Sequence, residues 1–125
     1  LKQPKVYFFD TGFVEGDEGA RFENAVACAL LKRLHFLEDT LGERNALHYV
    51  RDKEKHEVDF LTVRDGKPEW LVEAKVADAK APGIQYFSRK LGLESILLVK
   101  DLAREIQQEK VKVKRAAPWL AGLEA

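Results

Sequence analysis

The sequence contains one cysteine, no long apolar run and no excess of either charge. These features argue against an internal disulfide, a membrane span and strong non-specific binding of nucleic acid, respectively. Of 125 residues only Cys28 carries a thiol, which rules out an internal disulfide and fits a reducing cytosol. The longest apolar run, residues 25–31, is far too short to span a bilayer. No charged segment followed by an apolar one opens the chain as a secretory signal would. We therefore expect a cytoplasmic protein that has no membrane span.

The charges balance, with 21 Lys and Arg residues, 21 Asp and Glu residues and a formal net charge of zero. Domains that bind nucleic acid tightly and without sequence preference are usually basic. Neutrality therefore argues against strong DNA affinity of this chain alone, although it leaves room for a local basic face. The phosphate-binding pattern G-x-x-x-x-G-K-[ST] does not occur, so any ATPase part lies outside this sequence.

Strand-like patterns recur along the chain, and two of them flank Asp65-Gly66, a dipeptide typical of tight hairpin turns. The predicted strands cover residues 6–9, 47–51, 57–63, 70–76, 95–99 and 110–114. The strand at 95–99 is apolar throughout, as in strands covered on both faces. The strand at 110–114 alternates Val and Lys, which is typical of a half-exposed strand at a sheet edge.

Helix-like patterns alternate with these strands, so we predict one mixed α/β domain over residues 1–125. The predicted helices cover residues 20–37, 82–91 and, as a short helix, 101–108, and residues 38–45 are expected to form a loop. Pro82 suits a first helical turn, and Gly92 suits a helix end. We expect a central sheet with the first helix on one face and the second on the other, and residues 118–120 packing the tail onto the core.

Three charged side chains interrupt the core-like strands of the predicted hairpin. They are Asp59, Glu73 and Lys75. Side chains two residues apart on a strand share a face, so Glu73 and Lys75 point the same way, and Asp59 is expected to share a face with Leu61. Ionised groups in a buried strand are costly unless they are paired, hydrogen-bonded or bound to a metal. The spacing alone leaves open either a solvated salt-bridge cluster or a functional site.

A pocket shared by Asp59 and Glu73 would suit a divalent cation. Two like charges about 4 Å apart repel by roughly 4 kcal/mol at an effective dielectric near 20, and a cation removes that repulsion. Mg²⁺ typically takes one or two carboxylates and can activate a water against a phosphoryl group. Lys75 would orient that water, and Glu23, near the apolar stripe of the first helix, would be a third acid. The reaction class is metal-assisted hydrolysis of a phosphodiester.

This order of residues resembles the PD-(D/E)XK nuclease superfamily. The resemblance consists of an acid on a helix, an Asp in one hairpin strand and Glu-x-Lys in the next, here Glu23, Asp59 and Glu73-Ala74-Lys75. Val58 precedes Asp59 where the superfamily pattern has Pro. The resemblance implies a restriction-endonuclease-like core, with a mixed sheet whose hairpin carries D…ExK and helices on both faces. It also implies DNA as substrate, and Mg²⁺ or Mn²⁺ held by Asp59, Glu73 and Glu23.

A second resemblance covers nearly the whole chain, and it is to the domain of unknown function at the C-terminus of many prokaryotic AAA-type ATPases. The segments that carry it are Lys5-Val6-Tyr7-Phe8-Phe9-Asp10-Thr11-Gly12, Gly19-Ala20-Arg21-Phe22-Glu23-Asn24-Ala25-Val26, Tyr49-Val50-Arg51, Glu57-Val58-Asp59-Phe60, Glu73-Ala74-Lys75 and Pro118-Trp119-Leu120. It implies a fragment of a longer chain with an upstream ATPase as its partner, and an oligomer is compatible with it. Arg51 is a secondary site candidate through this likeness. Gln85 is another, because RecB-type relatives place a Gln there, although Arg89 stands where they have Tyr.

Two functional hypotheses remain. One is a metal-dependent nuclease, and the other is an inactive nuclease-fold module for docking, oligomerisation or nucleic-acid binding. The presence of all four residues, Glu23, Asp59, Glu73 and Lys75, favours the nuclease. Asp10-Thr11-Gly12 resembles the motif of aspartic proteases, but that fold is almost wholly β and conflicts with the long helix. The three histidines have no metal-ligand spacing, and Cys28 lies within a helical pattern as a core residue would.

Overall fold

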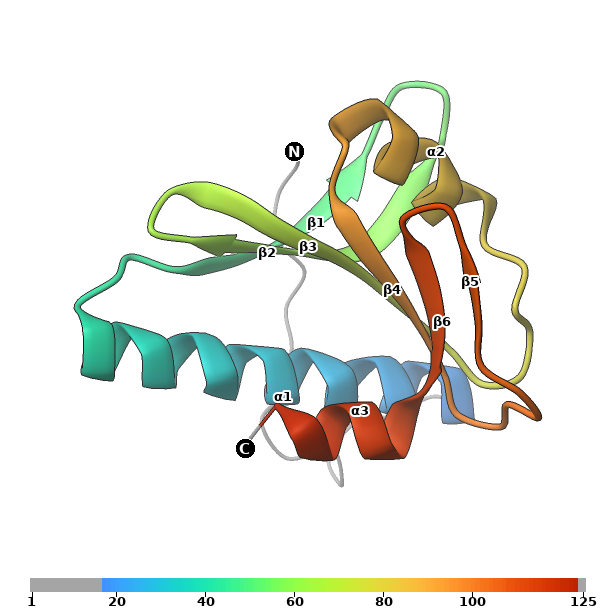
Figure 1. The fold of residues 1–125 in the computed structure, drawn as a ribbon, viewed down its shortest axis with the longest axis horizontal. Helices are drawn as coiled ribbons and strands as arrows, with labels where there is room; N and C mark the ends of the chain where they lie inside the picture. Colours follow the sequence, from blue (N-terminus) through green and yellow to red (C-terminus); the bar gives the residue numbers. More distant parts are fainter. Residues whose placement is uncertain (1–16, 124–125) are drawn as a thin grey trace.

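The computed structural model describes residues 17–123, which form three helices and a six-stranded sheet (Figure 1). The elements in chain order are α1 (Glu18–Leu41), β1 (Ala46–Arg51), β2 (Glu57–Arg64), β3 (Lys67–Lys75), α2 (Pro82–Leu91), β4 (Glu94–Val99), β5 (Ile106–Gln108), β6 (Val111–Arg115) and α3 (Ala116–Gly122). The strand expected at 6–9 and the motif Asp10-Thr11-Gly12 lie outside the described residues. No helix within residues 17–123 combines the length and the apolar character needed to cross a membrane.

The sheet is mixed, as expected, with the spatial order β1-β2-β3-β4-β6-β5. The first three strands pair antiparallel, β3–β4 and β4–β6 pair parallel, and β5 returns antiparallel to β6. Each face of the sheet carries its own apolar cluster, one beneath α2 and one beneath α1 and α3. Figure 1 shows α1 and α3 on one side of the sheet and α2 on the other, which confirms the predicted two-sided arrangement.

The β2–β3 hairpin forms where Asp65-Gly66 predicts it. Asp65 has φ 52° and Gly66 has φ 80°, so both turn residues are left-handed, as a two-residue type I′ turn requires. Phe60 pairs with Val72, and the register shifts only next to Pro68, where a residue without an N–H is tolerated. The hairpin therefore holds the two central strands of the site in a fixed register.

Helix α1 is longer than predicted at both ends. The Asp17 side chain accepts a hydrogen bond from the Ala20 amide at 2.8 Å, and Gly42, with φ 70°, ends the helix. Residues 38–41, predicted as the start of a loop, are instead the exposed last turn. Polar residues on the solvent side of a helix look like a loop in sequence, and here Gly42 rather than polarity marks the end.

Helix α2 has the predicted bounds, and its first turn lies against the start of β2. Ile84 and Phe87 are buried in the cluster on this face of the sheet. A Cβ at Gly83 would lie 2.1 Å from the Glu57 carbonyl oxygen, which is well inside contact distance. Only glycine therefore allows this approach, which fixes α2 beside the strand that leads to Asp59.

Two predictions for the C-terminal third of the chain are wrong, one about a helix and one about the position of a strand in the sheet. Residues 101–108 do not form a short helix but an irregular stretch followed by β5. Glu109, with φ 56°, turns the chain so that β5 pairs with β6, and β6 therefore lies inside the sheet rather than at its edge. Its alternation is nevertheless real, because Val111 and Val113 are buried while Lys112 and Lys114 are half-buried.

Two further contacts tie α1 and the tail to the hairpin. Arg33 donates two hydrogen bonds of 2.9 Å to the Glu69 carboxylate, and its guanidinium lies 4.1 Å from the Trp70 ring centroid. Burial alone would raise the pKa of Glu69, but Arg33, together with hydrogen bonds from Thr62 and Arg64, outweighs burial and holds this pKa low. Trp119 of α3 meets Trp70 edge to face at 5.6 Å, which confirms that the tail packs onto the core.

Candidate functional site

A bulge in β2 redirects the side chain of Asp59. The β1–β2 register shifts so that Tyr49 alone faces both Asp59 and Phe60. Phe60 lies in the cluster beneath α1, whereas Val58 and Leu61 both lie in the cluster beneath α2, so the regular alternation breaks at Asp59. The prediction that Asp59 shares a face with Leu61 is therefore wrong. The extra residue carries the Asp59 carboxyl group toward α1.

Asp59 and Glu73 are hydrogen-bonded to each other's strands. The Asp59 amide donates to Glu73 Oε1 at 3.2 Å, and the Ala74 amide donates to Asp59 Oδ2 at 3.0 Å. The β2–β3 register, continued by one residue beyond its last pair, places Asp59 opposite Glu73. The aspartate side chain is too short to carry its carboxyl group far from its own amide. The two carboxyl groups therefore lie well within the reach of a single hydrated metal centre.

A third acid approaches from the helix, as the sequence suggested. Glu23 of α1 shares a hydrogen bond with the Asp59 carboxyl group, and burial, this hydrogen bond and the charge of Glu73 together raise the pKa of Asp59 to about 8. Burial also raises the pKa of Glu73, against the Asp59 N–H and the charge of Lys75, which lower it. A hydrogen bond between two carboxyl groups needs a proton. The cluster therefore holds at least one proton at neutral pH.

One pocket of about 550 Å³ brings together all four predicted site residues, Glu23, Asp59, Glu73 and Lys75. The other residues of its wall are Gly19, Ala20, Glu57, Ala74, Val76, Ala77 and Asp78. Sequence reasoning missed two acids among them. Glu57 precedes Asp59 by two residues and Asp78 follows Lys75 by three, so both flank the motif. Neither acid belongs to the D…ExK pattern that singled out the other residues.

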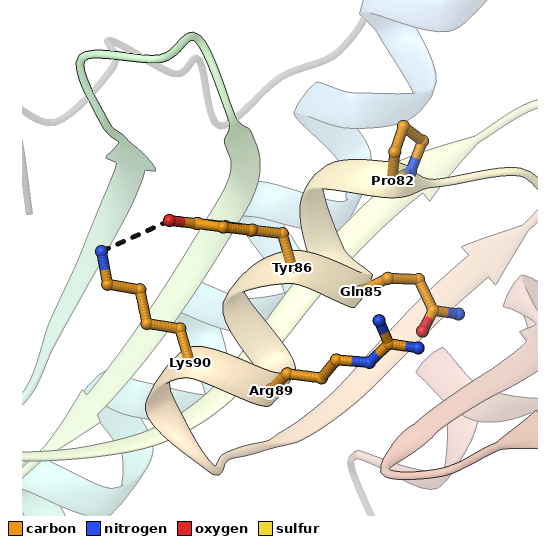
Figure 2. Close-up of a pocket in the computed structure, with 5 residues that line it drawn as sticks. All are labelled: Pro82, Gln85, Tyr86, Arg89 and Lys90. Carbon is orange, nitrogen blue, oxygen red and sulfur yellow. Dashed lines mark hydrogen bonds between the residues drawn. The ribbon is translucent and has the colours of Figure 1, made fainter.

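The two secondary candidates lie outside this pocket. Arg51 lines a neighbouring depression beside the β1–β2 loop. Of the residues that line this depression, only Glu57 also lines the acid pocket. Gln85 projects from α2 (Figure 2). Its side-chain amide donates a hydrogen bond of 2.9 Å to the Gln108 side chain. The structure therefore groups neither side chain with the acids.

The acid pocket offers the donors that Mg²⁺ and Mn²⁺ prefer, because carboxylate oxygens suit hard divalent cations. Within residues 17–123, no three acidic, histidine or cysteine side chains are already arranged around one metal position. A carboxylate has two oxygens, so accepting one backbone N–H is compatible with ligation through the other. Ligation at Asp59 has to displace the proton that it shares with Glu23. The residues fit a divalent cation once that proton has left.

Comparison with known families gives one match. A family model described as "Domain of unknown function (DUF4143)" matches residues 18–118. This span includes every residue that lines the acid pocket. No match was found among curated proteins or among solved structures.

Proposed function

The chain belongs to the DUF4143 family, and from this starting point we propose that it is a metal-dependent nuclease domain that hydrolyses DNA phosphodiester bonds. The observation that carries the proposal is the acid pocket, in which Asp59 and Glu73 interlock across β2 and β3 while Glu23 reaches in from α1. Burial, with the neighbouring acids Glu23 and Glu73, raises the pKa of Asp59, and burial raises the pKa of Glu73. Acids whose pKa values are shifted by burial and by charged neighbours in one pocket are candidates for a functional site.

The proposed roles follow from the side-chain chemistry. Asp59 and Glu73, assisted by Glu23, would hold Mg²⁺ or Mn²⁺. A bound divalent cation neutralises phosphate charge and lowers the pKa of a coordinated water. Lys75 lies at the same pocket, and its ammonium group would donate hydrogen bonds to the attacking water and offset the negative charge that develops on the phosphate. Binding of the cation would displace the proton that Asp59 shares with Glu23.

The fold assignment is part of the proposal. A mixed sheet with an acid-bearing hairpin and helices on both faces is compatible with a restriction-endonuclease-like core. The resemblance to domains that follow AAA-type ATPases adds the proposal that the nuclease acts beside an ATPase in a longer chain. Its alternative is an inactive module of the same fold that serves docking, oligomerisation or nucleic-acid binding.

The test is cleavage of single- and double-stranded DNA with Mn²⁺ at low salt, where weak phosphate contacts still hold substrate. We expect Asp59→Ala to abolish both cleavage and calorimetric Mn²⁺ binding. Lys75→Ala should lower turnover by roughly 10²–10³ and leave Mn²⁺ binding intact. Lys67→Ala is the matched control, because Lys67 is an exposed lysine at the opposite end of β3.

One result would reject the nuclease, and another would reject the role assigned to Lys75. The nuclease is rejected if the wild-type chain neither cuts DNA nor binds Mn²⁺, both alone and within the longer protein. The inactive module is then the better account of the function. If Lys67→Ala slows cleavage as much as Lys75→Ala does, the role assigned to Lys75 is wrong.

A further inference from the structure

A track of two overlapping depressions crosses the outer face of α2, and it starts in the loop where the wall of the acid pocket ends. The wall of the acid pocket ends at Asp78, in the loop after β3, and the next depression begins at Ala79. That depression shares Pro82, Gln85 and Arg89 with a third one, which lies over α2 (Figure 2). The acid pocket and this track therefore meet at consecutive residues of one loop, Asp78 and Ala79.

The track is basic, although the whole chain is neutral. Three cations, Lys80, Arg89 and Lys90, line the second and third depressions, against one acid, Glu109. Glu109 pairs with Arg89 at 3.0 Å, and both side chains are largely exposed, at 59% and 67%. Exposed pairs of this kind contribute little free energy, so a phosphate group can take the place of the Glu109 carboxylate. The α2 face thus supplies the local basic surface that the overall charge left open.

An aromatic ring is held rigidly beside these cations. His56 stacks on Tyr86 with ring centroids 3.7 Å apart and planes 4° apart, and Asp52 holds the His56 ring through a contact of 3.0 Å to Nδ1. His56 covers one face of the half-buried Tyr86 ring, and the Phe87 ring meets it edge to face with the centroids 5.1 Å apart. Tyr86 also lines the depression. The neighbour there is Lys90, whose Nζ lies 5.5 Å from the ring centroid and 3.5 Å from the hydroxyl (Figure 2). The result is a preformed flat aromatic surface with the flexible side chain of Lys90 beside it.

We propose that this α2 surface, defined as Gln85, Tyr86, Arg89 and Lys90, binds an unpaired stretch of single-stranded nucleic acid next to the acid pocket. A base stacks on Tyr86, Arg89 and Lys90 contact backbone phosphates, and the Gln85 amide faces base edges. Stacking on an aromatic ring requires an unpaired base, because bases of a duplex are already stacked on one another. The inference rests on the proposed function only where it concerns cleavage of the bound strand, because binding of the strand needs neither a metal nor a cut.

The test is fluorescence anisotropy with a labelled oligonucleotide, single-stranded or annealed as a blunt duplex, in chelator at low salt. The wild-type chain should bind the single strand more tightly than the duplex. Tyr86→Leu should weaken single-strand binding by about tenfold, the effect expected for loss of one stacked base. Tyr86→Phe keeps the ring and should bind as the wild type does.

Charge variants give an independent readout. Lys90→Gln and Arg89→Gln should each lower the slope of log affinity against log salt by about 0.7, the value for one phosphate contact on a single strand. Lys67→Gln, the exposed lysine at the far end of β3, should leave this slope unchanged. Because Arg89 and Lys90 are exposed, their replacement does not threaten folding, and these variants decide the question if Tyr86→Leu fails to fold.

Equal affinity of the wild type for single strand and duplex would overturn the inference, and so would unchanged binding in Tyr86→Leu together with an unchanged slope in Lys90→Gln. Failure of the two proposals is distinguishable. Single-strand binding through Tyr86 without any cleavage by Mn²⁺ refutes the nuclease and leaves the α2 surface standing. Cleavage of a single strand by Tyr86→Leu with a wild-type KM refutes the α2 surface and leaves the nuclease standing.

Discussion

Replacing Asp59 with Asn is expected to stabilise the protein in the absence of metal, and the gain should grow as the pH rises. The Asn side chain has nearly the same shape, and its carbonyl oxygen can still accept the Ala74 N–H. Its amide group can donate to Glu23 where the aspartic acid shares a proton. Unlike Asp59, it cannot ionise. Asp59→Asn therefore mimics the protonated site at every pH.

The magnitude follows from the pKa of Asp59, which rises from an ordinary 3.8 to about 8 in the fold. A group whose pKa is higher in the folded state stabilises the fold below its unfolded pKa, and this stabilisation is lost as the pH rises through the folded value. Each pKa unit is worth about 1.4 kcal/mol, so full ionisation of Asp59 costs at most about 5–6 kcal/mol. Because the pocket is open to water, we expect about half of this, roughly 2–3 kcal/mol at pH 9. The difference should vanish near pH 4.

The assay is urea unfolding of wild type and Asp59→Asn in chelator at pH 4, 7 and 9. Asp39→Asn, an exposed acid on α1, is the control and should be neutral at each pH. Glu73, whose pKa is also raised, remains in both proteins, so its contribution largely cancels in the difference. A loss of stability in Asp59→Asn at pH 9 would refute the reasoning. It would mean that Asp59 stabilises the fold as an ionised partner rather than crowding its neighbours.

Three further predictions concern the metal, the approach of α2 and the charged contact on α1. Mn²⁺ affinity should rise by about tenfold per pH unit up to about pH 8 and then level off, because binding releases the proton of the acid cluster, and calorimetry in two buffers of different ionisation enthalpy measures that release. Gly83→Ala should lower the free energy of unfolding by about 3 kcal/mol or more, since its Cβ meets the Glu57 carbonyl oxygen at 2.1 Å, whereas Gly122→Ala has open space and should be neutral in the same melt. Glu69→Gln breaks the two-bond pair with Arg33 and should cost about 1–3 kcal/mol, with the same loss at pH 6 and pH 8.

Much of the hairpin and of α2 could be predicted because local residues determine them. Asp65-Gly66 supplies the two left-handed residues of a type I′ turn, and Pro82 and Gly92 mark the two ends of α2. These signals depend on neighbours in the sequence and on backbone geometry alone. Strand spacing and charge brought the four predicted site residues together only as one of two possibilities, and the family pattern favoured the site, because their meeting depends on how the helix packs on the sheet.

What could not be predicted depends on distant pairing. The face of the sheet to which the Asp59 side chain points follows from the register of β2 with β1. No local sequence pattern predicts the bulge in that register. The placement of β6 inside the sheet depends on β5, a strand of three residues whose side chains are exposed and give no periodic signal. The His56–Tyr86 stack likewise joins a loop and a helix 30 residues apart in sequence. Each of these features is set by tertiary contacts rather than by propensity.

The bulge in β2 makes the acid pocket vulnerable to a change of a single codon. At the bulge, two residues of β2, Asp59 and Phe60, lie opposite a single residue of β1, Tyr49. The strand β2 is therefore one residue longer than β1 at this point. Deletion of Asp59 would restore a regular ladder and keep the fully buried Phe60 in the core. Deletion of Phe60 would instead move the acid into that core position, where the fold would not tolerate it. The genetically accessible deletion therefore preserves the fold and removes the acid, so descendants of this gene can lose the site in one step while remaining stable proteins.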